Sequence, residues 1–173
     1  MTEKTVFEAN AARIVELHEA LHLAFRDRDR SSHHWAVWEE AARRFRKSYD
    51  HLAFPGGLIR QQDRLKQLDP EAVELAVRFL EADPWFFRSG YIKEGFIRVL
   101  KRIPLSEDQQ SSLRRALLAK VDQGAGREFR QYCTLARAIQ TADFRAHLET
   151  RLDTKDQKVS QRARWMLEAL RQG

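Results

Sequence analysis

Two histidines and a glutamate stand close enough together in this chain to bind a metal ion and activate water. His18-Glu19-Ala20-Leu21-His22 matches the pattern H-E-x-x-H. On a helix, residues four apart lie one turn apart on the same face, so His18 and His22 could share a Zn²⁺. Glu19 would then act as the general base for a metal-bound water. Hydrolysis is therefore the chemistry that this pentapeptide predicts.

The pentapeptide lies in the first of two helices that the sequence predicts for its N-terminal third. Apolar residues recur at intervals of three and four over residues 7–25 and again over 35–52, which is the period of an amphipathic helix. The polar run 27–32 between them ends in two serines, which are suitable helix N-caps. Because so short a turn makes the helices antiparallel, residues 1–53 are predicted to form an αα-hairpin.

The two predicted helices should face each other along their apolar seams. If the turn is centred near residue 30, positions whose numbers sum to about 60 become neighbours. This register places His18 opposite Ala42 and Glu39 beside His22.

With Glu39 as a third ligand, the hairpin resembles the metal-binding helix pair of the zincins, a family of zinc hydrolases. The resemblance implies His18, His22 and Glu39 as ligands and Glu19 as the base. The chain departs from that family because only 17 residues precede His18, too few for the substrate-binding sheet that usually flanks the zincin helix. The alternative is a core histidine at position 18 and an exposed ion pair between His22 and Glu39.

Residues 54–69 form the best candidate boundary in the chain. Phe54-Pro55-Gly56-Gly57 interrupts the helical period, because Pro lacks a backbone N–H donor and Gly readily adopts a positive φ. A short helix should follow, with Leu58, Gln62 and Leu65 on one face.

The second half of the chain repeats one apolar spacing three times. Positions i, i+4, i+7, i+8 and i+11 fall on one stripe of a helix. The residues are Ile92, Phe96, Val99, Leu100 and Ile103; Tyr132, Leu135, Ala136 and Ile139, with Glu128 first; and Val159, Ala163, Met166, Leu167 and Leu170. Each set follows another amphipathic segment. The predicted helix pairs are therefore 70–82 with 86–102, 106–123 with 127–140, and 142–153 with 156–171.

Helix pairs that recur every 31 to 36 residues resemble HEAT-like repeats, here over residues 70–171. The resemblance implies an all-α chain in which about three pairs stack into a right-handed α-solenoid. Its second helices would line a concave surface for peptides, proteins or nucleic acid, and the hairpin would cap its N-terminal end. Trp85, Phe86 and Phe87 crowd the turn of the first pair, so a more globular bundle is the alternative.

The second helix of each predicted pair is rich in basic residues. Residues 88–102, 127–140 and 157–171 of these helices together carry twelve basic and three acidic residues, in a chain whose formal net charge is +6. The sector opposite the apolar stripe holds Arg98, Lys101, Arg130, Arg137 and Arg164. Because Arg pairs with phosphate or carboxylate through two hydrogen bonds, this face predicts an anionic macromolecule as partner, either DNA or RNA or an acidic protein. Trp165 lies in the same sector and could stack on a base or anchor a partner, or pack under the C-terminal residues. The alternative is an Arg-rich face that is only solvated.

Other catalytic patterns are missing from the sequence. It has no Gly-rich phosphate loop, no nucleophile elbow and no Cys–His pairing. The single cysteine, Cys133, excludes an internal disulfide and favours a reducing compartment. We also find no apolar run typical of a signal peptide or a membrane span. We therefore expect a cytoplasmic, non-enzymatic binding module without a cofactor, and the small zinc hydrolase is the alternative.

Overall fold

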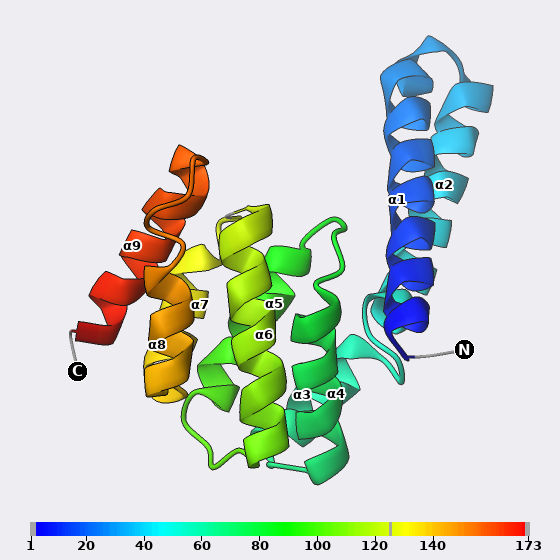
Figure 1. The fold of residues 1–173 in the computed structure, drawn as a ribbon. Helices are drawn as coiled ribbons and strands as arrows, with labels where there is room; N and C mark the ends of the chain where they lie inside the picture. Colours follow the sequence, from blue (N-terminus) through cyan, green and yellow to red (C-terminus); the bar gives the residue numbers. More distant parts are fainter. Residues whose placement is uncertain (1–2, 125, 172–173) are drawn as a thin grey trace.

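The chain is helical through nearly all of the part that the computed structural model describes, residues 3–124 and 126–171 (Figure 1). This part contains no β-strand, which confirms the all-α prediction. The α-helices are α1 (Glu3–Asp27), α2 (Ser32–Ala53), α3 (Leu58–Lys66), α4 (Pro70–Ala82), α5 (Ser89–Leu100), α6 (Glu107–Gln123), α7 (Phe129–Ala138), α8 (Ala142–Glu149) and α9 (Gln157–Arg171). No helix within those ranges is both long enough and apolar enough to cross a membrane.

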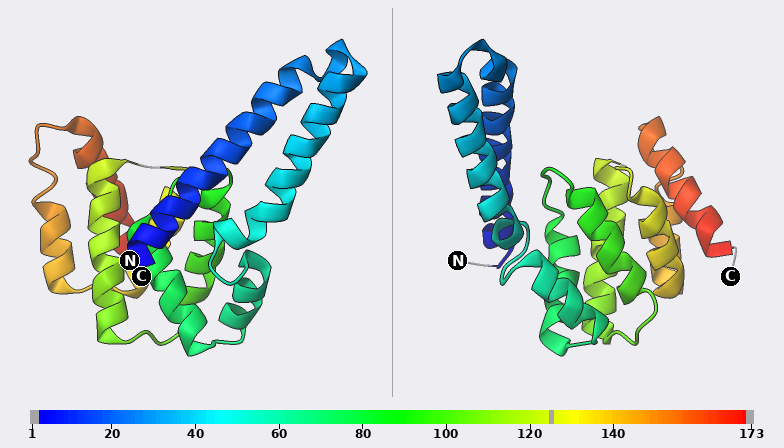
Figure 2. Two further views of the ribbon diagram at one scale, coloured as in Figure 1. Left: turned by 90° about the vertical axis from the view of Figure 1, so that its right-hand side faces the viewer. Right: turned by 180° about the vertical axis from the view of Figure 1, so that it is seen from behind.

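The first two helices form an antiparallel hairpin whose tip extends away from the rest of the molecule (Figures 1 and 2). A 3-10 turn, η1 (Arg28–Arg30), joins them, and the Ser31 hydroxyl accepts a hydrogen bond from the His34 N–H at the start of α2. Phe7 and Ile14 are buried at the base of the hairpin, where α1 contacts α4. Near the tip, by contrast, large apolar side chains remain exposed.

The observed hairpin register differs from the predicted one. The ring of His18 contacts Phe45, with 5.5 Å between centroids, and this partner lies three residues further along α2 than the predicted Ala42. The ring of Phe25 likewise contacts Trp38 at 6.5 Å. The cause is η1, which continues the first helical segment to Arg30 and moves the centre of the turn along the chain.

The Pro-Gly break is a turn, but its aromatic residue belongs to the core. Gly56 and Gly57 have φ values of 82° and 89°, the left-handed region that favours glycine. Phe54 is 1% exposed, and its ring contacts Phe79 of α4 at 5.3 Å and Phe96 of α5 at 5.0 Å. This contact attaches the hairpin to the helices that follow it.

Helices α4 to α9 are arranged as three consecutive pairs, α4–α5, α6–α7 and α8–α9. Each first helix contacts the next first helix, so that α4 packs on α6 and α6 packs on α8. The second helices do the same, α5 with α7 and α7 with α9. In Figure 1, α6 and α8 lie in front of α5 and α7.

Side-chain caps determine where several of these helices begin. Asp69-Pro70 has the sequence pattern of an N-cap followed by Pro at the first helical position, and the Asp69 carboxylate accepts a hydrogen bond from the Ala72 N–H as this pattern predicts. Ser106 and Gln109 have the spacing of a capping box and form one. Asp83-Pro84 predicts an N-cap in the same way, but this prediction is wrong: Asp83 ends α4 in a left-handed conformation, and α5 begins only at Ser89.

The repeated apolar spacing forms the core of these pairs. All its residues are buried except Val99, Ile103 and Val159, which are partly buried and packed against the core. Leu100 is 1% exposed and Leu167 is 4% exposed, as predicted. The second helices are therefore held in place by the stripe that the sequence marks.

Candidate functional site

His18 and His22 lie together on α1, as their spacing predicts. Their Nε2 atoms are 3.2 Å apart, within hydrogen-bonding distance. The ring of His18 also stacks on Phe87, with centroids 4.4 Å apart and planes at 24°. Partial burial and the neighbouring His22 lower the pKa of His18, while Glu19 opposes this shift. His18 thus contacts the turn between α4 and α5 as well as its own hairpin.

Glu39 does not join this pair of histidines. A shift of three residues in the register carries Glu39 about 4.5 Å toward the hairpin tip relative to its predicted place beside His22. Among the residues that the structure describes, no group of three or more His, Cys, Asp or Glu could hold a metal ion. The predicted set of zinc ligands is therefore not assembled.

Three of the five predicted basic residues, Arg98, Lys101 and Arg137, lie close together on the neighbouring helices α5 and α7. Partial burial lowers the pKa of Lys101, and repulsion from Arg102, Arg137 and Arg98 lowers it further. We refer to Arg98, Lys101, Arg102 and Arg137 as the cation cluster. Arg98 has one ion pair, with Glu94 at 3.6 Å, whereas the other three have none within the described ranges. The cluster thus concentrates positive charge that the fold neutralises only in part.

The other predicted binding residues lie elsewhere. Arg130 and Trp165 line a shallow pocket of about 390 Å³ between α7 and α9. The ring of Trp165 is about half exposed there and contacts Phe129 at 6.2 Å. Arg164 lines a different hollow, beside the start of α9. The five basic residues and Trp165 are therefore divided among three places on the surface.

By their helical spacing, Ile97 and Cys133 also belong to the polar sector opposite the apolar stripe, yet both are buried. Ile97 is 0% exposed and Cys133 is 7% exposed, because α5 and α7 are each covered by more than one neighbouring helix. Burial raises the pKa of the Cys133 thiol to about 11. Cys133 is thus a structural residue and not an activated nucleophile.

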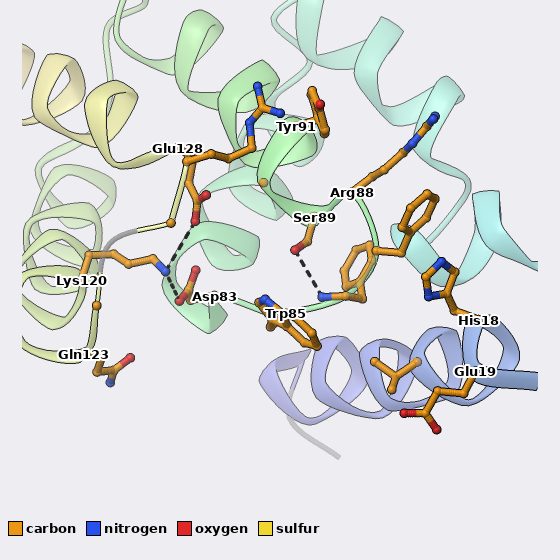
Figure 3. Close-up of a pocket in the computed structure, with 17 residues that line it drawn as sticks. His18, Glu19, Asp83, Trp85, Arg88, Ser89, Tyr91, Lys120, Gln123 and Glu128 are labelled. Carbon is orange, nitrogen blue, oxygen red and sulfur yellow. Dashed lines mark hydrogen bonds and ion pairs between the residues drawn. The ribbon is translucent and has the colours of Figure 1, made fainter. Parts of the chain in front are cut away.

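A cleft of about 760 Å³ lies where the hairpin meets the repeated pairs. Side chains of α1 form one wall, and the α4–α5 and α6–α7 turns form the others (Figure 3). Trp85 is 79% exposed on the α1 side of the cleft, and Tyr91 is 55% exposed on the α5 side. Phe87, which also lines the cleft, is 40% exposed. Exposed aromatic side chains around a cleft of this size are typical of a binding site.

A network of ion pairs supports the base of the cleft. The Asp83 carboxylate forms ion pairs with Lys93 and with Lys120, and the N–O distance is 2.6 Å in each. Lys120 also lies 3.7 Å from Glu128, so that it links both turns (Figure 3). Lys93 is only 2% exposed, and burial lowers its pKa although Asp83 opposes the shift. The network fixes the two turns relative to each other, and its opposite charges balance.

The buried Tyr132 hydroxyl lies beside this network and has no hydrogen-bond partner within the described residues. Burial, together with the charges of Asp83 and Glu128, raises the pKa of Tyr132 well above its usual value. Its phenol therefore stays neutral.

Two non-glycine residues of the α4–α5 turn have positive φ angles. Asp83 has φ 48° and Arg88 has φ 67°, a conformation that is unfavourable for residues with a Cβ atom. Such strain is tolerated where the surroundings impose it, and it is more frequent at functional sites. Here the Asp83 ion pairs hold one end of the turn, and a hydrogen bond from the Phe86 N–H to the Ser89 hydroxyl holds the other.

Two arginines reach the mouth of the cleft. The Arg127 guanidinium lies 3.7 Å from the centroid of the Tyr91 ring and donates to Glu94 at 3.1 Å. The Arg88 guanidinium lies 5.2 Å from the ring centroid of Phe87, and no carboxylate pairs with it in the part of the chain that the structure describes. The mouth therefore combines aromatic faces with cationic groups.

Only a weak signal in the sequence marks this cleft. The run Trp85-Phe86-Phe87 indicates crowding within the turn, and Phe86 is indeed buried. Three aromatic residues immediately before a helix could have suggested an exposed binding surface instead. The partners from α1 and α6 are far away in the chain, so no local pattern identifies them.

No protein-family model, no curated protein and no solved structure significantly matches this chain.

Proposed function

We propose that this protein is a non-enzymatic binding module built from three HEAT-like helix pairs, and that its cation cluster binds nucleic acid. The three pairs are α4–α5, α6–α7 and α8–α9. The first helix of each pair packs on the first helix of the next pair, and the second helices pack on each other in the same way. This pattern of contacts supports the assignment. The hairpin α1–α2 would occupy the N-terminal end.

The observation that carries the proposal is the partial neutralisation of the cation cluster. Folding brings Lys101 close enough to Arg98, Arg102 and Arg137 for them to affect its pKa. Gathering like charges costs free energy, and phosphate groups would relieve that repulsion. A nucleic-acid backbone presents several phosphates whatever its base sequence, so it fits such a site better than a single carboxylate does.

Reversing the charge of two cluster residues tests the proposal. Arg98→Glu with Arg137→Glu should abolish binding of fluorescein-labelled DNA in an anisotropy titration. The matched control, Arg26→Glu with Arg46→Glu, changes two exposed arginines of the hairpin, and both double variants lower the formal net charge from +6 to +2. Equal losses in the two would mean that net charge, and not the cluster, governs binding.

The salt dependence provides a second test on the unaltered protein. Four phosphate contacts to a single strand give a slope of about −3 for log K against log salt, so affinity should fall roughly fifty-fold between about 50 and 200 mM NaCl. If no DNA or RNA is bound at low salt but an acidic protein is, the nucleic-acid proposal is wrong.

Hydrolysis at His18 has less support. Its ring is stacked on Phe87, and the carboxylate that the sequence suggested as third ligand lies outside the pair. If the purified protein contained one zinc ion per molecule, and if the double variant His18→Gln with His22→Gln lost it, the hydrolase would again be the better interpretation.

A further inference from the structure

We infer that the nucleic acid is single-stranded, and that the cleft beside the hairpin holds its unpaired bases against Trp85 and Tyr91. The inference rests on the proposed function, which it deepens by naming the form of the ligand. It depends on the exposed aromatic rings, on the placement of charges along α5 and on the size of the cleft.

The two rings are available for stacking. Trp85 is 79% exposed and Tyr91 is 55% exposed, and they lie on opposite sides of the same cleft (Figure 3). Arg127 already covers one part of Tyr91 through a cation–π contact, which fixes the orientation of the phenol ring. Aromatic rings stack on any base, whereas the bases of a duplex are stacked on each other and do not reach such rings.

The exposed face of α5 connects the cleft to the cation cluster. Tyr91 and Arg98 are separated by seven residues, so their side chains project from one side of α5. Lys101 and Arg102 follow directly after the last residue of α5, Leu100. The rise along the helix from Tyr91 to Arg98 is about 10 Å. Neighbouring nucleotides of a strand are about 3.4 Å apart, so about three nucleotides cover this distance.

The charges at the cleft suit the same ligand. Arg88 at its mouth has no carboxylate partner within the described ranges, and a phosphate could pair with it. The carboxylates of Asp83 and Glu128 are balanced by Lys93 and Lys120, so the interior presents little net charge to the bases. The cleft of about 760 Å³ is large enough to hold such groups.

The test compares a labelled thymidine strand of about 12 nucleotides with a duplex of the same length, at roughly 50 mM salt. The unaltered protein should bind the single strand more tightly. Trp85→Ala and Tyr91→Ala should each weaken single-strand binding about five-fold to a hundred-fold, as loss of one stacking partner does. Duplex binding should stay unchanged, because it needs only the cation cluster.

Trp35→Ala is the matched control, since it removes a Trp that is 45% exposed near the hairpin tip, away from the cleft. It should affect neither ligand. The melting temperature of each variant, measured in parallel, shows that the aromatic substitutions leave the fold intact.

The possible results separate this inference from the proposed function. Equal affinity for the two ligands, or an equal effect of Trp85→Ala on both, would overturn the inference while binding by the cation cluster stands. If no oligonucleotide binds, the proposed function fails, and the inference fails with it. A selective loss of single-strand binding in both cleft variants supports both.

Discussion

The hairpin and the repeated helix pairs are built from the same amphipathic pattern, yet they bury it to different extents. In the pairs, the apolar stripes of α5, α7 and α9 are covered by neighbours, and most side chains of the repeated spacing are buried. Toward the tip of the hairpin, Leu23, Phe25, Trp35 and Val37 are each between 45% and 61% exposed. An amphipathic helix thus buries its apolar face completely only where further elements cover it.

Charge distinguishes the two regions as well. Residues 1–69 carry 12 basic and 11 acidic side chains, whereas residues 70–173 carry 19 and 14. Ion pairs on the hairpin are mostly local, such as Arg13 with Glu16. In the repeated pairs, ion pairs also join different helices and turns, as Lys120 does with Asp83. The surplus of positive charge therefore lies mainly in residues 70–173.

The largest effect should come from the residue at the junction of the two regions. Phe54→Ala removes a ring packed against the hairpin, α4 and α5, and should lower the free energy of unfolding by about 3–5 kcal/mol. Urea unfolding followed by circular dichroism measures this. A loss below about 1 kcal/mol would mean that the hairpin is attached by other contacts.

Truncating a leucine in each region should separate core from tip. Leu100→Ala or Leu167→Ala should each cost about 2–5 kcal/mol, because the cavity is enclosed. Leu23→Ala, at a position that is 61% exposed on the hairpin, should change stability by no more than about 0.5 kcal/mol. Similar costs at the two positions would contradict the difference in burial, and would indicate that something covers the tip.

The reaction rate of a cysteine thiol compares the core of the repeated pairs, at Cys133, with the exposed hairpin, at position 23. Because the pKa of Cys133 is about 11, the folded protein at pH 8 should react with a thiol reagent at least about a hundred times more slowly than the unfolded chain. Moving the only cysteine to the tip, with Cys133→Ala and Leu23→Cys, should restore the rate of a free thiol. A fast reaction of native Cys133 would show that the repeated pairs open readily.

The smallest effect concerns His18, which lies where the two regions meet. The pKa of His18 is lowered in the folded state, mainly by burial. As the pH falls below about 6.5, the unfolded chain therefore binds a proton at His18 before the folded protein does. Stability should therefore decrease from pH 7 toward pH 5, until the folded form is protonated too. In His18→Phe this part of the decrease should be absent, whereas a variant of the exposed His33 should retain it. An unchanged pH profile in His18→Phe would place the cause elsewhere.

Much of the helical structure could be predicted from local patterns. The apolar period located every helix of the repeated pairs to within a few residues, and the caps at Asp69 and Ser106 occur where the sequence suggests. These signals act within one or two turns of chain, so they can be recognised without the fold. The prediction for Asp83 was wrong because Asp suits both an N-cap and a left-handed position.

The candidate sites were harder to predict, because they depend on side chains brought together from distant segments. The sequence supplied His18 and His22, but only the observed register and the packing of Phe87 decided what surrounds them. The cation cluster follows in part from the helical wheel, since Arg98 and Lys101 share a helix. The separation of Arg130 and Arg164 from it depends on how α7 and α9 cross.

The sequence by itself determined that this chain is all helical, where most helices begin and which stripe of each second helix is buried, because helix period and capping are local properties. Tertiary structure alone decided that Trp85 and Tyr91 line the same cleft and that four cations gather at the ends of α5 and α7. It also decided that Asp83, Lys93 and Lys120 form a network that is partly shielded from solvent. These arrangements depend on crossing angles and on the lengths of turns. Such quantities are set by the packing of the whole core, and no short stretch of sequence contains them.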